Sequence, residues 1–145
     1  MPIDIDAAAE QLAGEISSRL DAIGDAFIRP GWPATDIEIT TLIDQASERT
    51  VRELASDDPH TAAGAALTVV TTLWPAGVDV PLDWWATPLG TLTMLAGNDV
   101  VSQAMAARAL GVSPQRVAQL VAKGRLATVG DHVSTVSLRA RLGLR

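Results

Sequence analysis

The feature that most restricts the fold lies between positions 102 and 123, where the signal that ends one helix is followed within a few residues by the signal that begins another. Ser102 can cap a helix running through QAMAARAL, and Gly111 can end it in the left-handed conformation that favours glycine. Ser113 can cap a second helix, in which Pro114 takes the first position. The sequence therefore predicts two short helices joined by the three-residue turn Gly-Val-Ser.

The apolar residues of these two predicted helices are spaced so that they can pack on each other. They are Ala106, Ala107 and Leu110 in the first helix, Val112 in the turn, and Val117, Leu120 and Val121 in the second. The small side chain of Ala107 allows the helices to cross closely. A small residue, a glycine four positions later and flanking apolar residues are typical of a helix-turn-helix.

Charge divides the chain at Asn98 more sharply than hydropathy does. Residues 1–98 carry 15 acidic and 4 basic side chains, a net charge of −11, whereas residues 99–145 carry 2 acidic and 7 basic ones, a net charge of +5. Residues 109–126 contain three basic side chains and no acid. Such an asymmetry suggests that the small basic end contacts a polyanion. We therefore predict two domains, residues 1–97 and residues 98–145, with the boundary at 96–99.

The acidic part is predicted to be helical throughout. Apolar residues at spacings of three and four form one stripe, and the segment RPGWP at 29–33 is expected to end this first helix. The stripe consists of Ile5, Ala9, Leu12, Ile16, Leu20, Ile23 and Phe27. A possible capping box, Thr35 with Glu38, precedes a second helical face at Ile39, Ile43, Ala46, Thr50 and Leu54.

Two further helices are marked by a capping residue directly before a proline. Asp58 and Pro59 begin a helix over HTAAGAALTVVTTLW, and because this segment is apolar nearly all round we expect it to be the central helix. Thr87 and Pro88 begin a short fourth helix that ends at Gly97.

Four tryptophans lie at the proline-rich breaks between these helices. Trp32 is in the first break, and Trp74, Trp84 and Trp85 surround the second. Such residues are expected in the core or in a lid, whereas an exposed cluster would be a hot spot for a protein partner. The sequence does not choose between these two roles.

Residues 101–142 resemble the winged helix-turn-helix of the excisionase and MerR-like DNA-binding proteins. The resemblance lies in the two helices, in GRL at 124–126, in a hairpin turn at Gly130 and Asp131, and in a last helix, VSLRARL, that Thr135 can cap. It covers about 42 residues, and no family is recognised in residues 1–98. The expected fold is mainly all-α, with a helical N-terminal domain followed by a winged helix-turn-helix whose wing is a small β-hairpin.

The second helix of this unit is the predicted DNA-reading element, because its apolar residues face inward and its polar and small residues face outward. Arginine can pair with guanine through two hydrogen bonds and glutamine with adenine, whereas lysine and arginine also suit phosphates. The candidate DNA-binding residues are Ser113, Gln115, Arg116, Gln119, Lys123, Arg125, His132, Arg139 and Arg141. For Arg139, Arg141 and Arg145 a role as helix-end charges that favour the dipole is weighted equally. The two helices could also be structural packing that carries solvated charges.

These observations predict a sequence-specific DNA-binding protein that regulates transcription. Arginine outnumbers lysine 10 to 1, which suggests a high-GC genome, that of a bacterium or its phage. One helix-turn-helix covers few base pairs, so we expect a homodimer on double-stranded DNA, formed through residues 1–98. The alternative is a protein-interaction module, similar to an antitoxin or a host-takeover factor, whose acidic domain binds another protein.

Other classes of function find little support in the sequence. The chain has no cysteine, and His60 and His132 lie far apart without a metal-binding or catalytic pattern, so we expect no enzyme activity, metal or cofactor. The acidic N-terminal residues do not resemble a signal peptide, and no window is apolar enough for a membrane helix. We therefore expect a cytoplasmic protein.

Overall fold

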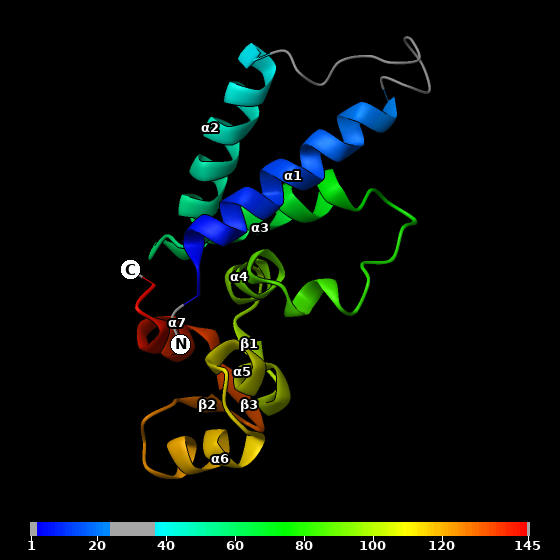
Figure 1. The fold of residues 1–145 in the computed structure, drawn as a ribbon. Helices are drawn as coiled ribbons and strands as arrows, with labels where there is room; N and C mark the ends of the chain where they lie inside the picture. The colour runs from blue at the N-terminus through cyan, green and yellow to red at the C-terminus, as the bar shows by residue number, and fades with distance from the viewer. Residues whose placement is uncertain (1–2, 24–36, 145) are drawn as a thin grey trace.

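The computed structural model describes residues 3–23 and 37–144, and within them the chain is mainly helical with one small antiparallel sheet (Figure 1). This confirms the predicted fold class. The elements in chain order are α1 (Ile5–Ile23), α2 (Ile37–Leu54), α3 (Pro59–Leu73), the 3-10 turn η2 (Trp84–Ala86), α4 (Pro88–Gly97), β1 (Val100–Val101), α5 (Gln103–Leu110), α6 (Pro114–Ala122), β2 (Thr128–Val129), β3 (His132–Ser134) and α7 (Thr135–Leu142).

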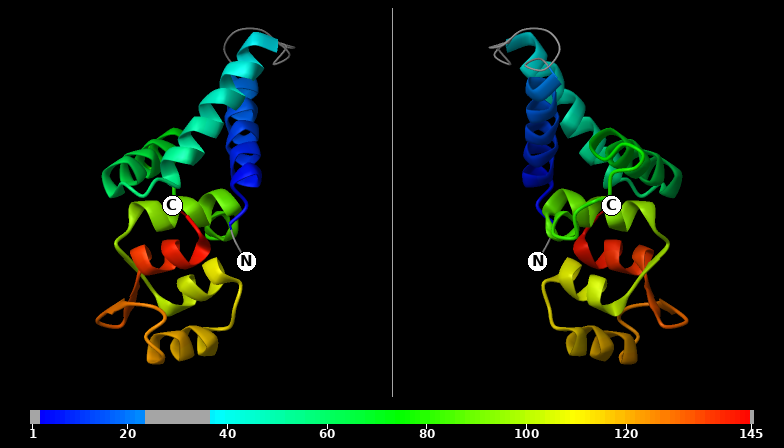
Figure 2. Two further views of the ribbon diagram at one scale, coloured as in Figure 1. Left: turned by 90° about the vertical axis from the view of Figure 1, so that its left-hand side faces the viewer. Right: turned by 90° about the vertical axis from the view of Figure 1, so that its right-hand side faces the viewer.

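The helices are arranged so that α6 lies at one end of the molecule and the hairpin of α1 and α2 projects from the other (Figures 1 and 2). α4 lies between these ends and packs against α1, α3 and α7. α3 lies on one flank, on the opposite side of the molecule from α1 (Figure 2). The predicted DNA-reading helix is therefore far from the acidic hairpin.

α1 follows the predicted apolar stripe from Ile5 to Ile16, whereas Leu20, further along the stripe, is 42% exposed. Leu12 is buried, and Ile5, Ala9 and Ile16 are half-buried against the core. The expected continuation of this helix to Phe27, its ending at 29–33 and the capping position Thr35 lie outside the described residues.

Both predicted cap-and-proline boundaries are confirmed. The Asp58 carboxylate accepts hydrogen bonds from the N–H groups of His60 and Thr61, at 3.4 and 3.0 Å, before α3 begins with Pro59. The Thr61 hydroxyl also donates to this carboxylate, and these hydrogen bonds from Thr61 lower the pKa of Asp58. Before α4, the Thr87 hydroxyl oxygen accepts from the N–H of Gly90 at 3.1 Å. Both helices thus begin where the sequence predicts.

The prediction that the third helix is central is wrong. α3 buries one face only, formed by Ala62, Ala65, Ala66, Val69 and Leu73, and its other face is exposed. The central helix is α4, in which every residue from Leu89 to Leu95 is buried. Neither helix contains aspartate, glutamate, lysine or arginine, so the pattern of apolar residues could not show which of them is central. Their positions depend on which neighbours surround them.

The tryptophans of the second break pack into the core. Trp84 is buried, and its ring makes edge-on contacts with Trp74 and Trp85 at centroid distances of 6.1 and 5.1 Å. The indole N–H of Trp84 donates to the carboxylate of Glu15 on α1 at 2.9 Å, and the guanidinium of Arg19 lies over Trp74. This arrangement favours the packing role over an exposed partner site. Trp32 lies outside the described residues.

The C-terminal part contains the predicted hairpin and one strand that the sequence did not predict. β2 and β3 pair antiparallel and are joined by Gly130 and Asp131, with Gly130 at a φ of 61°. β1 pairs with the other edge of β3, so the strand order is β1-β3-β2. The wing is thus held to the residues that precede α5.

The predicted cap of the last helix is wrong by one residue. Ser134 occupies the capping position without a side-chain hydrogen bond to the helix, and Thr135 is the first helical residue. The Thr135 side chain is buried, and its hydroxyl donates toward the carbonyl oxygens of Asn98 and Asp99 at 2.6 and 3.0 Å. This threonine therefore fastens α7 to the link between α4 and β1.

The predicted boundary at 96–99 coincides with the end of α4 at Gly97 and a short link to β1. The two parts share one continuous apolar core, which runs from Ala8 on α1 to Leu144 after α7. α7 packs on α4 across this boundary. The basic part is therefore held firmly against the helical part.

Candidate nucleic-acid interface

We define the helix-turn-helix segment as α5, the following turn and α6, residues 103–122, and its boundaries follow the predicted caps. The Ser102 hydroxyl oxygen accepts from the N–H of Met105, and that of Ser113 accepts from the N–H of Arg116, each at 3.2 Å. Gly111 ends α5 with a φ of 65°, in the left-handed region. Pro114 is the first residue of α6. The two helices are thus separated by the predicted three-residue turn.

The two helices pack through most of the predicted apolar residues. Ala106, Ala107, Leu110, Val117 and Leu120 are buried, and Val121 is half-buried. Val112 is the exception, since 37% of its surface is exposed. Its side chain lines an open hollow beside the turn. The remaining contacts are sufficient to fix α6 with one face directed outward.

The outward face of α6 carries the residues predicted to read DNA. Gln115, Arg116, Ala118, Gln119 and Ala122 are all exposed. The guanidinium of Arg116 donates to the side-chain oxygen of Gln119 at 3.1 Å, so these two side chains lie together one turn apart. No acidic residue occurs in α6. The face is positive, and its alanines leave room for close approach.

Basic and polar side chains continue beyond the end of α6. Lys123 occupies its C-terminal cap, and Gly124, with a φ of 65°, reverses the chain before the exposed Arg125. His132 is exposed on β3 of the hairpin. Asp131, at the hairpin turn, is the acidic residue of this wing.

Arg141 and Arg116 line the same hollow, although 25 positions separate them in the sequence. This hollow lies between the turn, α6 and the end of α7, and Leu110, Leu120 and Leu142 also contribute to it. Among the described residues the ion pairs lie on α1 and α2, at Arg19–Glu15 and Arg52–Glu48. The basic side chains around α6 are therefore not neutralised by acidic neighbours within that part of the chain.

Arg139 is placed differently from the other candidates. Its guanidinium is half-buried and donates to the carbonyl oxygen of Leu54 at 2.9 Å and to that of Ser56, at the end of α2. Burial lowers the pKa of Arg139, and the charge of Asp57 partly opposes this. Because these donors serve the backbone, we leave Arg139 out of the candidate interface.

One basic residue of the segment was not among the predicted site residues. Arg108 is exposed in the last turn of α5. The local excess of basic residues could have indicated Arg108, but the candidate residues were sought in and after the second helix, and Arg108 lies in the first. In known complexes the first helix of such a segment crosses the DNA backbone, where an exposed arginine suits phosphate.

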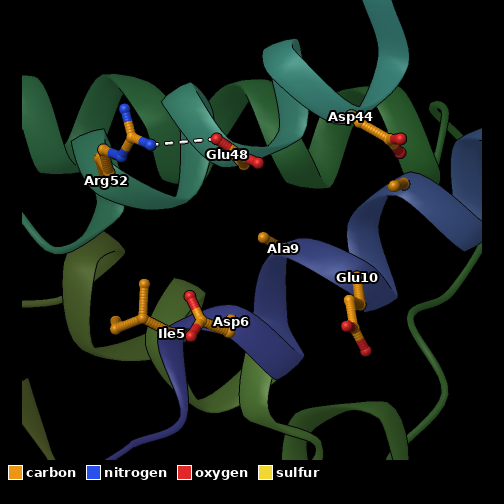
Figure 3. Close-up of a pocket in the computed structure, with 8 residues that line it drawn as sticks. Ile5, Asp6, Ala9, Glu10, Asp44, Glu48 and Arg52 are labelled. Atoms are coloured by element: carbon orange, nitrogen blue, oxygen red, sulfur yellow. Dashed lines mark hydrogen bonds and ion pairs between the residues drawn. The ribbon is translucent and has the colours of Figure 1, made fainter. Parts of the chain in front are cut away.

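A second hollow, lined by acidic residues, lies between α1 and α2 (Figure 3). Its acidic residues are Asp6 and Glu10 on α1 and Asp44 and Glu48 on α2, and Glu48 pairs with Arg52 at 3.0 Å. Such a lining repels a nucleic acid. Within the described ranges, 3–23 and 37–144, no group of three or more acidic or histidine side chains is arranged to hold a metal ion.

Comparisons of the chain with protein-family models, with curated proteins and with solved structures found no match. Within the described part of the chain, every helix is too short or too polar to cross a membrane.

Proposed function

We propose that this protein is a sequence-specific, double-stranded DNA-binding protein that regulates transcription, and that α6 reads the major groove. The observation that carries the proposal is the exposed face of α6, which contains no acidic residue. This helix belongs to a capped helix-turn-helix segment, and the β2–β3 hairpin follows it in the chain. This order of helices and hairpin supports the resemblance to the winged helix-turn-helix of excisionase and MerR-like proteins.

Arg116 and Gln119 are the proposed base-contacting residues. They lie one turn apart on the exposed face, and their hydrogen bond brings both side chains to one place on the helix surface. Arginine recognises guanine and glutamine recognises adenine through paired hydrogen bonds. The small side chains of Ala118 and Ala122 allow the helix backbone to lie deep in the groove.

The surrounding polar and basic side chains are the proposed contacts to the DNA backbone. Lys123 and Arg125 follow α6, His132 lies on the hairpin, and Arg141 borders the hollow next to Arg116. Ser113 and Gln115 lie at the N-terminus of α6, the positive end of its helix dipole, which attracts phosphate. Such contacts orient the protein on the duplex without reading sequence.

A second copy of the chain completes the proposed function. A single helix-turn-helix segment contacts few base pairs, and paired half-sites about 34 Å apart are the usual way to gain specificity. We therefore propose a homodimer on an inverted repeat. Activation or repression would follow from where such sites lie.

The proposal is tested by selecting bound sequences from a random duplex pool and titrating the selected site against an unrelated duplex at several salt concentrations. Arg116→Ala or Gln119→Ala should weaken binding to the selected site by about 1 to 3 kcal/mol and relax the base preference. Lys123→Ala should weaken binding to both duplexes alike and reduce the salt slope by about one.

The matched control is Arg49→Ala, which removes an exposed positive charge from α2. It should leave binding to both duplexes unchanged. The proposal fails if no sequence is enriched, or if Arg116→Ala binds the selected site as tightly as the unaltered protein.

The acidic hollow between α1 and α2 supports one alternative, a protein-interaction module whose partner is basic (Figure 3). In that case the protein would form a stoichiometric complex with another protein and show no salt-dependent affinity for duplex DNA. The same titration separates the two functions.

A further inference from the structure

The exposed face of α3 is uncharged, although the part of the chain to which it belongs is strongly acidic. The helix contains no aspartate, glutamate, lysine or arginine. Its exposed residues beyond the first turn are Ala63, Gly64, Leu67, Thr68, Thr71 and Thr72, and Leu67 is 66% exposed. A helix without charges on its outer face is expected to be covered.

Two threonines of this face, Thr68 and Thr71, can lose their water without leaving unpaired hydroxyl groups. The Thr68 hydroxyl donates to the carbonyl oxygen of Gly64 at 3.0 Å, and that of Thr71 donates to the carbonyl oxygen of Leu67 at 2.8 Å. Since burying an unsatisfied hydroxyl is costly, these two internal hydrogen bonds lower the penalty of covering the face. The threonine methyl groups then add to the apolar surface.

The shape of this face suits a second helix. A Cβ atom placed on Gly64 would meet no heavy atom within 4 Å, so the backbone is open to close approach there, while Leu67 protrudes one turn further along. Next to α3 the surface sinks into a hollow. On the side of α3 it is lined by Ala62 and Ala63, and the charged Asp57, Asp99 and Arg139 line other parts of it. A protruding leucine beside a depression is a surface that can fit a copy of itself.

The charge of the protein and the position of α3 indicate that a second copy of the chain covers the exposed face of α3. Residues 1–98 have a net charge of −11, so two copies repel each other unless they meet on a face without charges. Leu42 on α2 is also exposed, but Arg49 and Glu53, seven and eleven positions later, fall on the same side of that helix. In addition, α3 lies on a flank whereas α6 lies at the end of the molecule, so a twofold axis along that flank leaves both copies of α6 at one end (Figure 2).

We propose that α3 packs antiparallel against the α3 of a second copy, with Leu67 of each copy against Ala63 and Gly64 of the other. The choice of a second copy as the partner rests on the proposed function, which requires two DNA-reading helices on one side of a dimer. The surface itself is assigned from the contacts of α3 alone.

The first experiment is sedimentation of the full chain without DNA. The unaltered protein should be a dimer at micromolar concentration, and Leu67→Asp should raise the dimer dissociation constant about 100-fold, because each dimer loses two buried leucines. The matched control is Leu82→Asp, which changes a leucine that is 85% exposed and lies outside α3, and it should dimerise normally. Thermal melting of each variant shows that the fold is retained.

The second experiment uses the absence of cysteine from the chain. Gly64→Cys should form a disulfide-linked dimer under mild oxidation, whereas Leu82→Cys should stay largely uncrosslinked. A monomeric unaltered protein, or a Leu67→Asp variant that dimerises normally, would overturn the inference. Because neither experiment contains DNA, a protein that dimerises through α3 but binds no duplex would contradict the proposed function alone.

Discussion

Gly90 shows how a single residue sets the distance between α4 and the turn before it. A Cβ atom at this position would lie 2.0 Å from the carbonyl oxygen of Trp84. That oxygen already accepts hydrogen bonds from the N–H and the hydroxyl of Thr87, which hold it in place. We expect Gly90→Ala to lower the free energy of unfolding by about 2 kcal/mol, measured by chemical denaturation.

Gly14 supplies the control for that substitution. It lies on the exposed side of α1, where an added Cβ atom meets nothing within 4 Å. Gly14→Ala should therefore stabilise the protein by up to about 1 kcal/mol, since alanine loses less backbone entropy in a helix. Equal effects of the two substitutions would contradict the close approach of α4 to Trp84.

At the scale of the elements, Arg139 joins α7 to α2. This contact leads to a prediction that separates structural arginines from the proposed DNA-binding ones. Arg139→Ala leaves the carbonyl oxygens of Leu54 and Ser56 without their cationic donor and should cost about 2 kcal/mol of unfolding free energy. Arg141 is exposed on the same helix, so Arg141→Ala should change the unfolding free energy by less than about 0.5 kcal/mol.

DNA titrations of the two variants complete this test, under conditions where both are folded. Arg141→Ala should reduce the salt slope by about one, and Arg139→Ala should leave it unchanged. A reduced slope for Arg139→Ala would return that residue to the proposed DNA contacts.

The elements also show which features a sequence can predict. Helix starts were predicted correctly at Asp58, Thr87, Ser102 and Ser113, because a capping side chain bonds to the backbone only two or three residues away. The outward face of α6 was predictable for a similar reason, since helical periodicity fixes which side chains oppose the buried Val117 and Leu120.

Features that depend on distant contacts were not predictable. β1 has only two residues and owes its conformation to pairing with β3, more than thirty positions later. The shared hollow of Arg116 and Arg141 and the attachment of Arg139 to α2 likewise require the packed structure. The central place of α4 was missed because it and α3 have similar compositions.

At the scale of the whole molecule, opposite charges are held at opposite ends. The α1–α2 hairpin, which carries the acidic hollow near its base, projects from one end, and the positive face of α6 lies at the other (Figures 2 and 3). Repulsion between an acidic surface and DNA does not depend on the base sequence, and its range shortens as the salt concentration rises. The Debye length is about 8 Å at 0.15 M salt and about 30 Å at 0.01 M. The hairpin should therefore oppose DNA binding only at low salt.

This arrangement predicts how neutral variants bind an unrelated duplex. The triple variant Asp6→Asn, Glu10→Gln and Asp44→Asn should bind such DNA a few-fold more tightly than the unaltered protein at about 0.01 M salt, and equally at about 0.15 M. The comparison is Asp131→Asn, which removes one negative charge from the hairpin turn beside His132. That single change should tighten binding at both salt concentrations, because a charge within a Debye length of the phosphates is never fully screened. If the triple variant instead gains as much affinity as Asp131→Asn at 0.15 M, the acidic hairpin must lie close to the bound DNA. The DNA would then not be contacted only at the α6 end of the molecule.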